Sequence, residues 1–458
     1  MRNETKVILY LLVFACFMKF LFPFNSFLYD DEHKDVDGVF YLAKYDSFFY
    51  LNEINNGEIK NTLSFIGIGL KSLFRTNLPL YWLPAIFGVL NCILFYFVAR
   101  KLYAVFPSVV ASLLFLLHPY SFFSTFKGYY DTNFLIVTLV LLLLYCLLIK
   151  DWVGAIIILV VFSFTWNGWY IFLLFSVVCF GLYQVLYKKK YWYLIFPVLA
   201  FIFFWKKALA KITSYNSMRM VSELTSYDFS IKVDMILIPI LSILVLIMIV
   251  YFVRYYGVKE TLKYKMLIVV AGFCIFLILS LGMVRFFYLF IIFYSLILGY
   301  LIALIDKKYF VVCLTVLAVI FCVLAFDADY NRKTIIMEDS VVERVSVLDG
   351  CIDSSWDFGS MYQAYTKAKV LQKGSPHNFN RFATGLLLPE DEGLKFFNKG
   401  CYIIINSYDI KKMEVYSNLS GIPISADSFF NQDSYNYYTN IGFSKGRYIN
   451  VVVLKRKI

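Results

Sequence analysis

The sequence predicts a mainly α-helical membrane protein of about eleven spans with a small α/β domain on the extracytoplasmic side. The 458 residues are 61% hydrophobic and 20% aromatic, whereas soluble domains are about half apolar. Apolar runs long enough to cross a bilayer alternate with short polar turns, and Lys and Arg gather in every second turn. Residues 327–458, in contrast, have the composition of a soluble domain.

The net charge of +12 does not indicate nucleic-acid binding. The basic residues lie mostly in short tracts between apolar runs, which is the pattern that sets the orientation of membrane spans. Residues 7–24 follow Arg2 and Lys6, so we expect a retained first span with a cytoplasmic N-terminus. The polar segment 25–79 then lies outside.

The remaining spans follow from the same alternation of apolar runs and charged turns. They are expected at residues 80–99, 105–125, 131–149, 152–166, 168–187, 191–206, 234–253, 265–283, 285–305 and 308–326. Residues 1–326 thus form the multi-span domain, with outer loops 25–79 and 207–233. An odd number of spans places the C-terminal domain, 327–458, outside the cytoplasm. Strand-like runs at 402–406 and 450–454 predict an α/β fold for this domain.

Most of the nine Cys residues lie in apolar segments, where a thiol is usually a small packing residue. Cys351 and Cys401 lie in the polar C-terminal domain. They can form a disulfide if this domain is extracytoplasmic, although the sequence alone favours two free thiols. The three His residues form no cluster, so a His-ligated metal site is not expected.

Three acids, far apart in sequence, are expected on the outer side of the membrane: Asp46, Asp131 and Glu223. Any one alone is more often a solvated loop charge. Together they suit a hard divalent cation such as Mg²⁺ or Mn²⁺, which prefers carboxylate oxygens. Arg285 begins a span on the same side, and two interpretations stay open for it. It is either an interfacial anchor or a clamp for a phosphate group.

Two stretches resemble signatures of a known family. They are Gly128-Tyr129-Tyr130-Asp131-Thr132-Asn133 and Ser355-Trp356-Asp357-Phe358-Gly359. Both resemble motifs in the catalytic subunit of oligosaccharyltransferase, of the AglB or PglB type, which is a GT-C glycosyltransferase. The resemblance implies transfer of a glycan from a polyprenyl (pyro)phosphate carrier to the Asn of an Asn-x-Ser/Thr sequon in a polypeptide.

The resemblance also implies roles for the membrane-domain residues. Asp46, Asp131 and Glu223 would be catalytic and would bind Mn²⁺ or Mg²⁺, and Asp46 and Glu223 would also engage the acceptor amide. Asn133 stands where the family usually has a second acid, and it would offer an uncharged oxygen to the metal. Arg285 would grip the phosphate of the lipid carrier.

In the C-terminal domain the resemblance implies an acceptor pocket. Trp356 and Asp357 would hold the hydroxyl of the sequon Ser or Thr. Asp409 and Lys412 resemble the Asp-x-x-Lys motif that flanks this pocket in one branch of the family. Ser355 replaces the first Trp of the usual Trp-Trp pair, which thins one wall of the pocket.

The predicted function is therefore protein N-glycosylation by a multi-pass protein of the plasma membrane. Its partners would be a lipid-linked oligosaccharide such as a dolichol-linked one, an acceptor polypeptide and the bilayer, with no nucleic acid and no further subunit. Two alternatives stay open. One is another polyprenyl-phosphate-sugar-dependent GT-C transferase that acts on hydroxyl or lipid acceptors. The other is a non-catalytic membrane carrier or flippase for lipid-linked sugar, which predicts charges along a path through the midplane rather than at one face.

Overall fold

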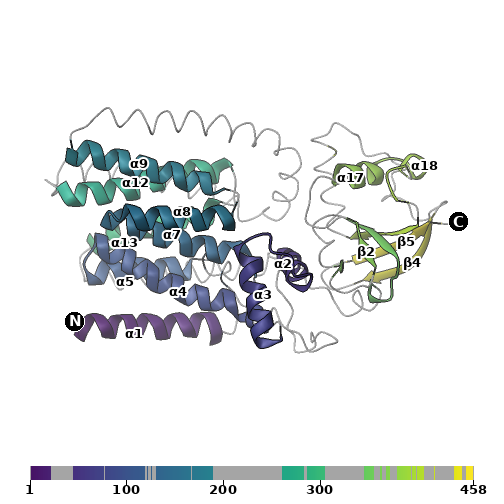
Figure 1. Ribbon diagram of the computed structural model, residues 1–458, viewed down its shortest axis with the longest axis horizontal. Helices are drawn as coiled ribbons and strands as arrows, with labels where there is room; N and C mark the ends of the chain where they lie inside the picture. Colours follow the sequence, from purple (N-terminus) through teal and green to yellow (C-terminus); the bar gives the residue numbers. More distant parts are fainter. Residues whose placement is uncertain are drawn as a thin grey trace.

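The structure is a computed structural model. It describes residues 2–21, 45–76, 78–118, 121, 125, 130–166, 168–188, 260–282, 286–304, 345–354, 362–363, 368–371, 379–393, 395–398, 400–406, 417, 438–445 and 450–456. Within them, long helices form a bundle at the N-terminal end and strands form one sheet at the C-terminal end (Figure 1). The expected boundary between residues 326 and 327 lies outside the described residues.

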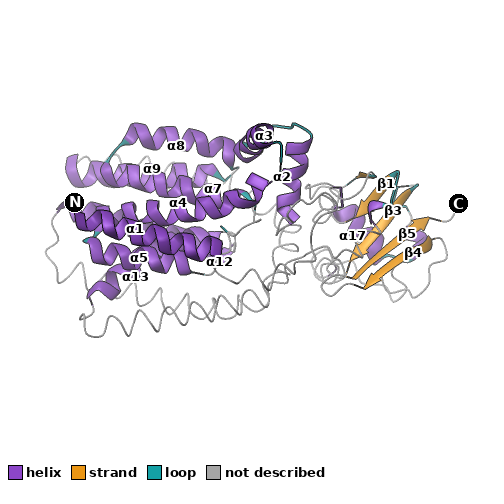
Figure 2. Ribbon diagram, turned by 90° about the horizontal axis from the view of Figure 1, so that it is seen from below, coloured by secondary structure: helices purple, strands orange, loops and turns teal. Residues whose placement is uncertain are grey.

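The bundle helices run roughly side by side along the long axis of the molecule (Figures 1 and 2). They are α1 (Arg2–Cys16), α4 (Leu78–Leu102), α5 (Val105–Leu117), α7 (Thr132–Ile149), α8 (Trp152–Thr165), α9 (Trp169–Lys188), α12 (Glu260–Gly282) and α13 (Phe287–Leu304). A π-helical turn, η1 (Phe17–Leu21), continues α1. Among the described helices, α4 and α7 are long and apolar enough to cross a membrane, and several shorter ones are equally apolar.

Most of the expected spans within the described residues coincide with helices to within a few residues. The span expected at 105–125 is an exception, because α5 ends at Leu117. His118 has extended backbone angles (φ −61°, ψ 128°), and Pro119 follows it. A residue before proline is disfavoured in the helical region, which ends α5 here. The spans expected at 191–206, 234–253 and 308–326 lie outside the described residues.

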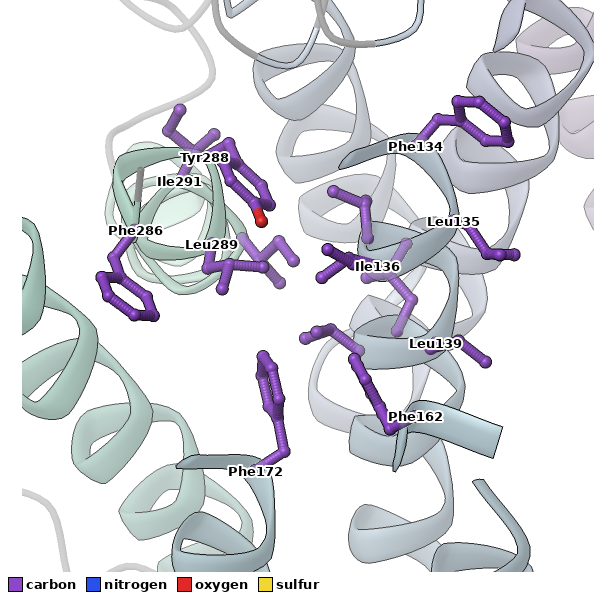
Figure 3. Packing of buried hydrophobic residues seen from close by; sticks show 14 of the residues in the cluster. Phe134, Leu135, Ile136, Leu139, Phe162, Phe172, Phe286, Tyr288, Leu289 and Ile291 are labelled. Carbon is purple, nitrogen blue, oxygen red and sulfur yellow. The ribbon is translucent and has the colours of Figure 1, made fainter. Parts of the chain in front are cut away.

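α7 is the central helix of the bundle, because it is apolar all round and almost every side chain is buried. Figure 3 shows Phe134, Ile136 and Leu139 of α7 in a cluster with side chains of α8, α9 and α13. Aromatic rings join these neighbours: Phe162 and Phe172 stack with centroids 4.5 Å apart. A helix that is hydrophobic on every face is stable only inside such a bundle.

Two short helices lie between the bundle and the sheet, α2 (Tyr45–Asn55) and α3 (Thr62–Phe74) (Figure 1). Asn61 caps α3 by accepting a hydrogen bond from the backbone N–H of Ser64 at 2.9 Å. Both helices come from the segment expected to be an outer loop.

The C-terminal sheet has the strand order β2 (Lys369–Val370), β1 (Cys351–Ser354), β3 (Cys401–Asn406), β5 (Asn450–Arg456), β4 (Tyr438–Lys445). β1 is parallel to β2 and β3, and β5 is antiparallel to both of its neighbours. α17 (Phe379–Leu387) and α18 (Glu390–Gly393) complete the described part of this unit. An α/β fold was predicted here, and the two expected strands are β3 and β5.

Cys351 and Cys401 form a disulfide, with their Cα atoms 4.7 Å apart. The preference for two free thiols was therefore wrong. The two residues face each other in the register of β1 and β3, which sequence spacing alone does not reveal.

Candidate functional site

Asp131 is the N-cap of α7, and its side chain is only 1% exposed. Its Oδ1 accepts a hydrogen bond from the backbone N–H of Thr132 at 2.6 Å. Its Oδ2 accepts one from Nδ2 of Asn133 at 2.9 Å. A carboxylate at a helix N-terminus is stabilised by the unpaired backbone N–H groups and the helix dipole. The sequence Asp131-Thr132-Asn133 thus keeps a buried carboxylate at one end of the central helix.

Asn133 presents an oxygen next to this carboxylate. Because its Nδ2 donates to Asp131, its Oδ1 is directed elsewhere. In the part of the chain that the structure describes, this buried Oδ1 has no hydrogen-bond partner. An unsatisfied buried acceptor costs about 1–3 kcal/mol, so the position favours a donor or a cation. Carboxylate and amide oxygens side by side are the ligand types that Mg²⁺ and Mn²⁺ prefer, so this pair fits one side of a cation site.

Tyr130 joins the start of α7 to α3. Its ring is fully buried, and its hydroxyl donates a hydrogen bond to the carbonyl oxygen of Leu63 at 2.9 Å. The absence of a side chain at Gly67 makes room for that hydroxyl, because a Cβ there would lie 2.8 Å from it. Burial raises the pKa of the Tyr130 phenol, so the hydroxyl stays protonated and remains a donor. The position of Asp131 is thereby linked to α3.

The backbone places Asp46 close to this point. Asp46 is the second residue of α2 and lies one helical turn before Tyr50. The Tyr50 ring meets the Tyr130 ring edge-on, with centroids 6.2 Å apart. Two of the predicted acids, Asp46 and Asp131, therefore come from segments that pack against each other.

Glu53 is a further acid of this region that the sequence analysis did not single out. It is 3% exposed and accepts a hydrogen bond from Ser64 Oγ of α3. Its Oε1 lies 3.7 Å from Nζ of Lys60. Burial raises the pKa of the Glu53 carboxyl above its ordinary value. Asp46, Tyr50 and Glu53 are spaced four and then three residues apart. This spacing in the sequence predicts that all three lie on one face of α2.

Phe286, the residue after Arg285, lies at the same end of the bundle as Asp131 and α3. The Phe286 ring meets the Trp166 ring edge-on at 5.9 Å. Thr165, at the end of α8, donates a hydrogen bond from Oγ1 to Oγ1 of Thr62 at the start of α3, 3.0 Å away. Arg285 itself lies outside the described residues, as does Glu223. No group of three metal-binding side chains occurs among the residues that the structure describes.

The predicted acceptor-pocket residues lie outside the described residues too, but the strands before them are described. β1 ends at Ser354, two residues before Trp356, and β3 ends at Asn406, three residues before Asp409. β1 and β3 are parallel neighbours, with Ser354 opposite Ile404. The two strands that precede these residues in the sequence therefore end at the same edge of the sheet.

A partly buried ion pair fixes the end of β1. Asp353 is fully buried and accepts a hydrogen bond from Nη2 of Arg381, on α17, at 2.7 Å. Together with the disulfide at Cys351, this pair ties β1 to α17 on one side and to β3 on the other.

The helical bundle and the α/β unit define the class of this fold: it is the fold of the oligosaccharyltransferases of the AglB type. The resemblance inferred from the two motifs is confirmed at the level of the fold. Solved structures of the Archaeoglobus fulgidus enzyme share it at low sequence identity. The apo crystal structure has a TM-score of 0.59 and 11% identity over 90% of this chain and 71% of its own.

Two further structures of that enzyme contain bound molecules. AglB in complex with an inhibitory peptide and a dolichol-phosphate has a TM-score of 0.55, with 12% identity over 91% of this chain and 71% of its own. The enzyme tethered to an acceptor peptide with an NVT sequon has a TM-score of 0.58, with 10% identity over 99% of this chain and 74% of its own. No protein-family model and no curated protein sequence matches this chain.

Proposed function

We propose that this chain is an oligosaccharyltransferase that moves a glycan from a polyprenyl (pyro)phosphate carrier to the Asn of an Asn-x-Ser/Thr sequon. The observation that carries the proposal is the fold, which is shared with AglB structures that hold a dolichol-phosphate or an NVT acceptor peptide. The buried Asp131 and Asn133 pair, at the bundle end near α2 and α3, supports it.

The proposal includes about eleven spans, a catalytic face and C-terminal domain outside the plasma membrane, and action as a single subunit. The two ends of α7 support this orientation. Asp131 caps the outer end, and Lys150 follows the other end, where its Nζ lies 3.9 Å from the centre of the Tyr187 ring. The disulfide of the C-terminal domain also supports an extracytoplasmic position, because disulfides persist mainly in oxidising compartments.

Within this proposal, Asp46, Asp131 and Glu223 would hold Mn²⁺ or Mg²⁺, with Asn133 contributing its free Oδ1. A bound divalent cation would keep the acids ionised and neutralise negative charge on the phosphate. Related structures include one of the Archaeoglobus fulgidus enzyme in complex with Zn and sulfate.

The other residues would position the two substrates. Arg285 would pair with the carrier phosphate, since a guanidinium binds phosphate oxygens in a bidentate fork. Trp356 and Asp357 would hold the sequon hydroxyl, with Asp409 and Lys412 beside them. A pocket built around a hydroxyl discriminates strongly against residues that lack one.

The reaction is a substitution at the anomeric carbon of the glycan. The bond from this carbon to the acceptor amide nitrogen forms, the bond to the carrier phosphate oxygen breaks, and one amide proton passes to water. Asp46 and Glu223 would engage the amide N–H groups and orient the nitrogen toward the anomeric carbon. The electrons of the broken bond stay on the phosphate, next to Arg285.

A transfer assay tests the proposal. Purified full-length protein in nanodiscs is mixed with lipid-linked sugar, Mn²⁺ and a fluorescent peptide that contains Asn-x-Thr. A second peptide with Gln in place of Asn is the matched control. We expect a glycosylated product from the Asn peptide alone and none after chelation of the metal. Transfer to a hydroxyl or lipid acceptor with the Asn peptide unmodified would instead identify a different GT-C transferase.

A further inference from the structure

Three lysine side chains converge at the end of the bundle opposite Asp131. They come from different helices: Lys101 near the end of α4, Lys150 at the C-cap of α7 and Lys265 near the start of α12. Nζ of Lys265 donates a hydrogen bond to the carbonyl oxygen of Lys101 at 2.8 Å. Nζ of Lys150 lies 5.9 Å from the centre of the Tyr264 ring, and Tyr264 directly precedes Lys265. Lys101 and Lys150 both repel the charge of Lys265.

The partners of these lysines are uncharged. Nζ of Lys150 lies 3.9 Å from the centre of the Tyr187 ring and 5.1 Å from that of the Tyr183 ring. Nζ of Lys101 lies 5.1 Å from the centre of the Tyr145 ring. A ring face attracts a cation but carries no net charge. Among the residues that the structure describes, no carboxylate forms an ion pair with any of the three lysines.

Two acids close to this cluster are engaged elsewhere. Oε1 of Glu4 lies 2.7 Å from Nε of Arg100, so this acid matches the charge of Arg100. The pair also places the first turn of α1 beside the end of α4, and Figure 1 shows the N-terminus at the end of the bundle far from the sheet. Asp151 accepts a hydrogen bond from the backbone N–H of Gly154 at 2.9 Å and thereby caps α8. The lysine cluster therefore keeps an excess of positive charge.

Exposed apolar side chains lie next to the lysines. Ile149, directly before Lys150, is 43% exposed, and Val153, at the start of α8, is 69% exposed. Leu267, two residues after Lys265, is 36% exposed. The lysines themselves are half-buried, so their ammonium groups stay within reach of a ligand. In a bilayer this arrangement offers positive charge to a headgroup and apolar contact to the acyl chains below it.

We infer that the lysine cluster, Lys101, Lys150 and Lys265, binds the phosphate headgroup of one anionic phospholipid in the cytoplasmic leaflet. This site goes beyond the proposed function and rests only on the membrane orientation given there. A phosphodiester accepts hydrogen bonds from ammonium groups and supplies negative charge, while its acyl chains cover Ile149 and Leu267. The bound lipid joins α4, α7 and α12 at the end of the bundle opposite the predicted cation site.

Native mass spectrometry tests this inference. Full-length protein is purified in detergent and equilibrated with an equimolar mixture of phosphatidylglycerol and phosphatidylcholine that carry the same acyl chains. The lipids that stay bound to the folded protein are then counted. A second arm adds inorganic phosphate to the mixture, which separates a lipid site from a site for the free ion.

Two double variants separate the charge of the cluster from its place in the fold. Lys150→Asn with Lys265→Gln removes two charges: Asn suits the left-handed conformation at position 150 (φ 66°), and Gln keeps a hydrogen-bond donor at position 265. Lys150→Arg with Lys265→Arg keeps both charges. Lys6→Gln is the matched control, because Lys6 is exposed on the same side of the membrane but outside the cluster.

We expect the wild type, K6Q and the double Arg variant to retain phosphatidylglycerol at least about fivefold over phosphatidylcholine, since one Lys near a surface contributes about fivefold to the binding of an anionic lipid. K150N/K265Q should lose most of this preference. Should it fail to fold by circular dichroism, each single substitution is compared with K6Q in the same mixture.

Equal retention of the two lipids by the wild type would overturn the inference, as would an undiminished preference in the folded charge-removal variants. Displacement of phosphatidylglycerol by inorganic phosphate would also overturn it, because the cluster would then take the free ion. The readout needs no glycan transfer, so its failure and the failure of the proposed function are distinguishable.

Discussion

Replacing Asp131 by Asn separates the charge of this residue from its role as a helix cap. Asn is about as good an N-cap as Asp, so the hydrogen bond from the Thr132 backbone can be kept. The new amide nitrogen faces Nδ2 of Asn133, where a carboxylate oxygen lies at 2.9 Å in the native chain. Two donors cannot bond each other. We expect the Asn133 amide to turn, so that its Oδ1 accepts from the new amide.

This rearrangement keeps a hydrogen bond between residues 131 and 133 but removes both cation ligands. The negative charge is lost, and the oxygen of Asn133 is no longer free. We expect D131N to lose less than about 1 kcal/mol of unfolding free energy. Its thermal unfolding midpoint (Tm) should therefore change little. Transfer should fall about a hundredfold or more, because a bound cation contributes several kcal/mol of charge stabilisation in the transition state.

The Asp131→Ala variant is the comparison. It loses the cap, worth about 0.5–2 kcal/mol, and leaves the buried Nδ2 of Asn133 without its acceptor, at a cost of about 1–3 kcal/mol. Tm should therefore fall clearly in this variant, whereas transfer is lost in both. Peptide transfer and Tm are measured on the same nanodisc preparations. Wild-type transfer by D131N with a normal Tm would refute the cation-site reasoning.

The remaining predictions concern the support of the site and its compartment. Gly67→Ala should lower both Tm and transfer, because its Cβ would clash with the Ile54 side chain of α2 and with the Tyr130 hydroxyl, whereas Gly69→Ala, with open space around it, should be neutral or slightly stabilising by up to about 1 kcal/mol. Cys351→Ser removes a cross-link between residues 50 positions apart and should destabilise the C-terminal unit by about 4 kcal/mol, measurable by protease resistance. Glu53 has a raised pKa in the folded state, so the wild type should become more stable as the pH falls from neutral through that pKa toward 4.5; this pH dependence of Tm should be absent in Glu53→Gln.

The helices of the bundle were predictable because their signal is local. An apolar run with a charged residue at each end identifies α7 almost to the residue: the expected 131–149 became Thr132–Ile149 with Asp131 as its cap. α8 and α9 were equally close. The span expected at 105–125 was too long, but His118-Pro119 was also expected to end a span or to kink it, and α5 does end at this dipeptide.

The contacts of the site were less predictable, because they join segments far apart in the chain. Nothing local marks Leu63 as the acceptor for Tyr130, 67 residues away. The pairing of Cys351 with Cys401 depends in the same way on the alignment of two strands. Glu53 was missed because the segment around it is polar overall, and its burial results from packing between α2 and α3. Asp46 and Asp131 were predicted on the same side of the membrane, and the segments that carry them pack against each other through Tyr50 and Tyr130.

The burial of α7 on all sides has a consequence for membranes of different thickness. A bilayer whose hydrocarbon core thins or thickens acts on the helices that contact lipid, by tilting them or moving their ends. α7 contacts mainly protein, so Asp131 should stay in place, whereas α8, whose outward side chains are exposed and apolar, should follow the bilayer. Two hydrogen bonds connect them through α3: Thr165 of α8 bonds to Thr62, and Tyr130 bonds to Leu63. In nanodiscs of graded acyl-chain length, transfer should therefore peak at one matching length and decline in thinner and thicker bilayers.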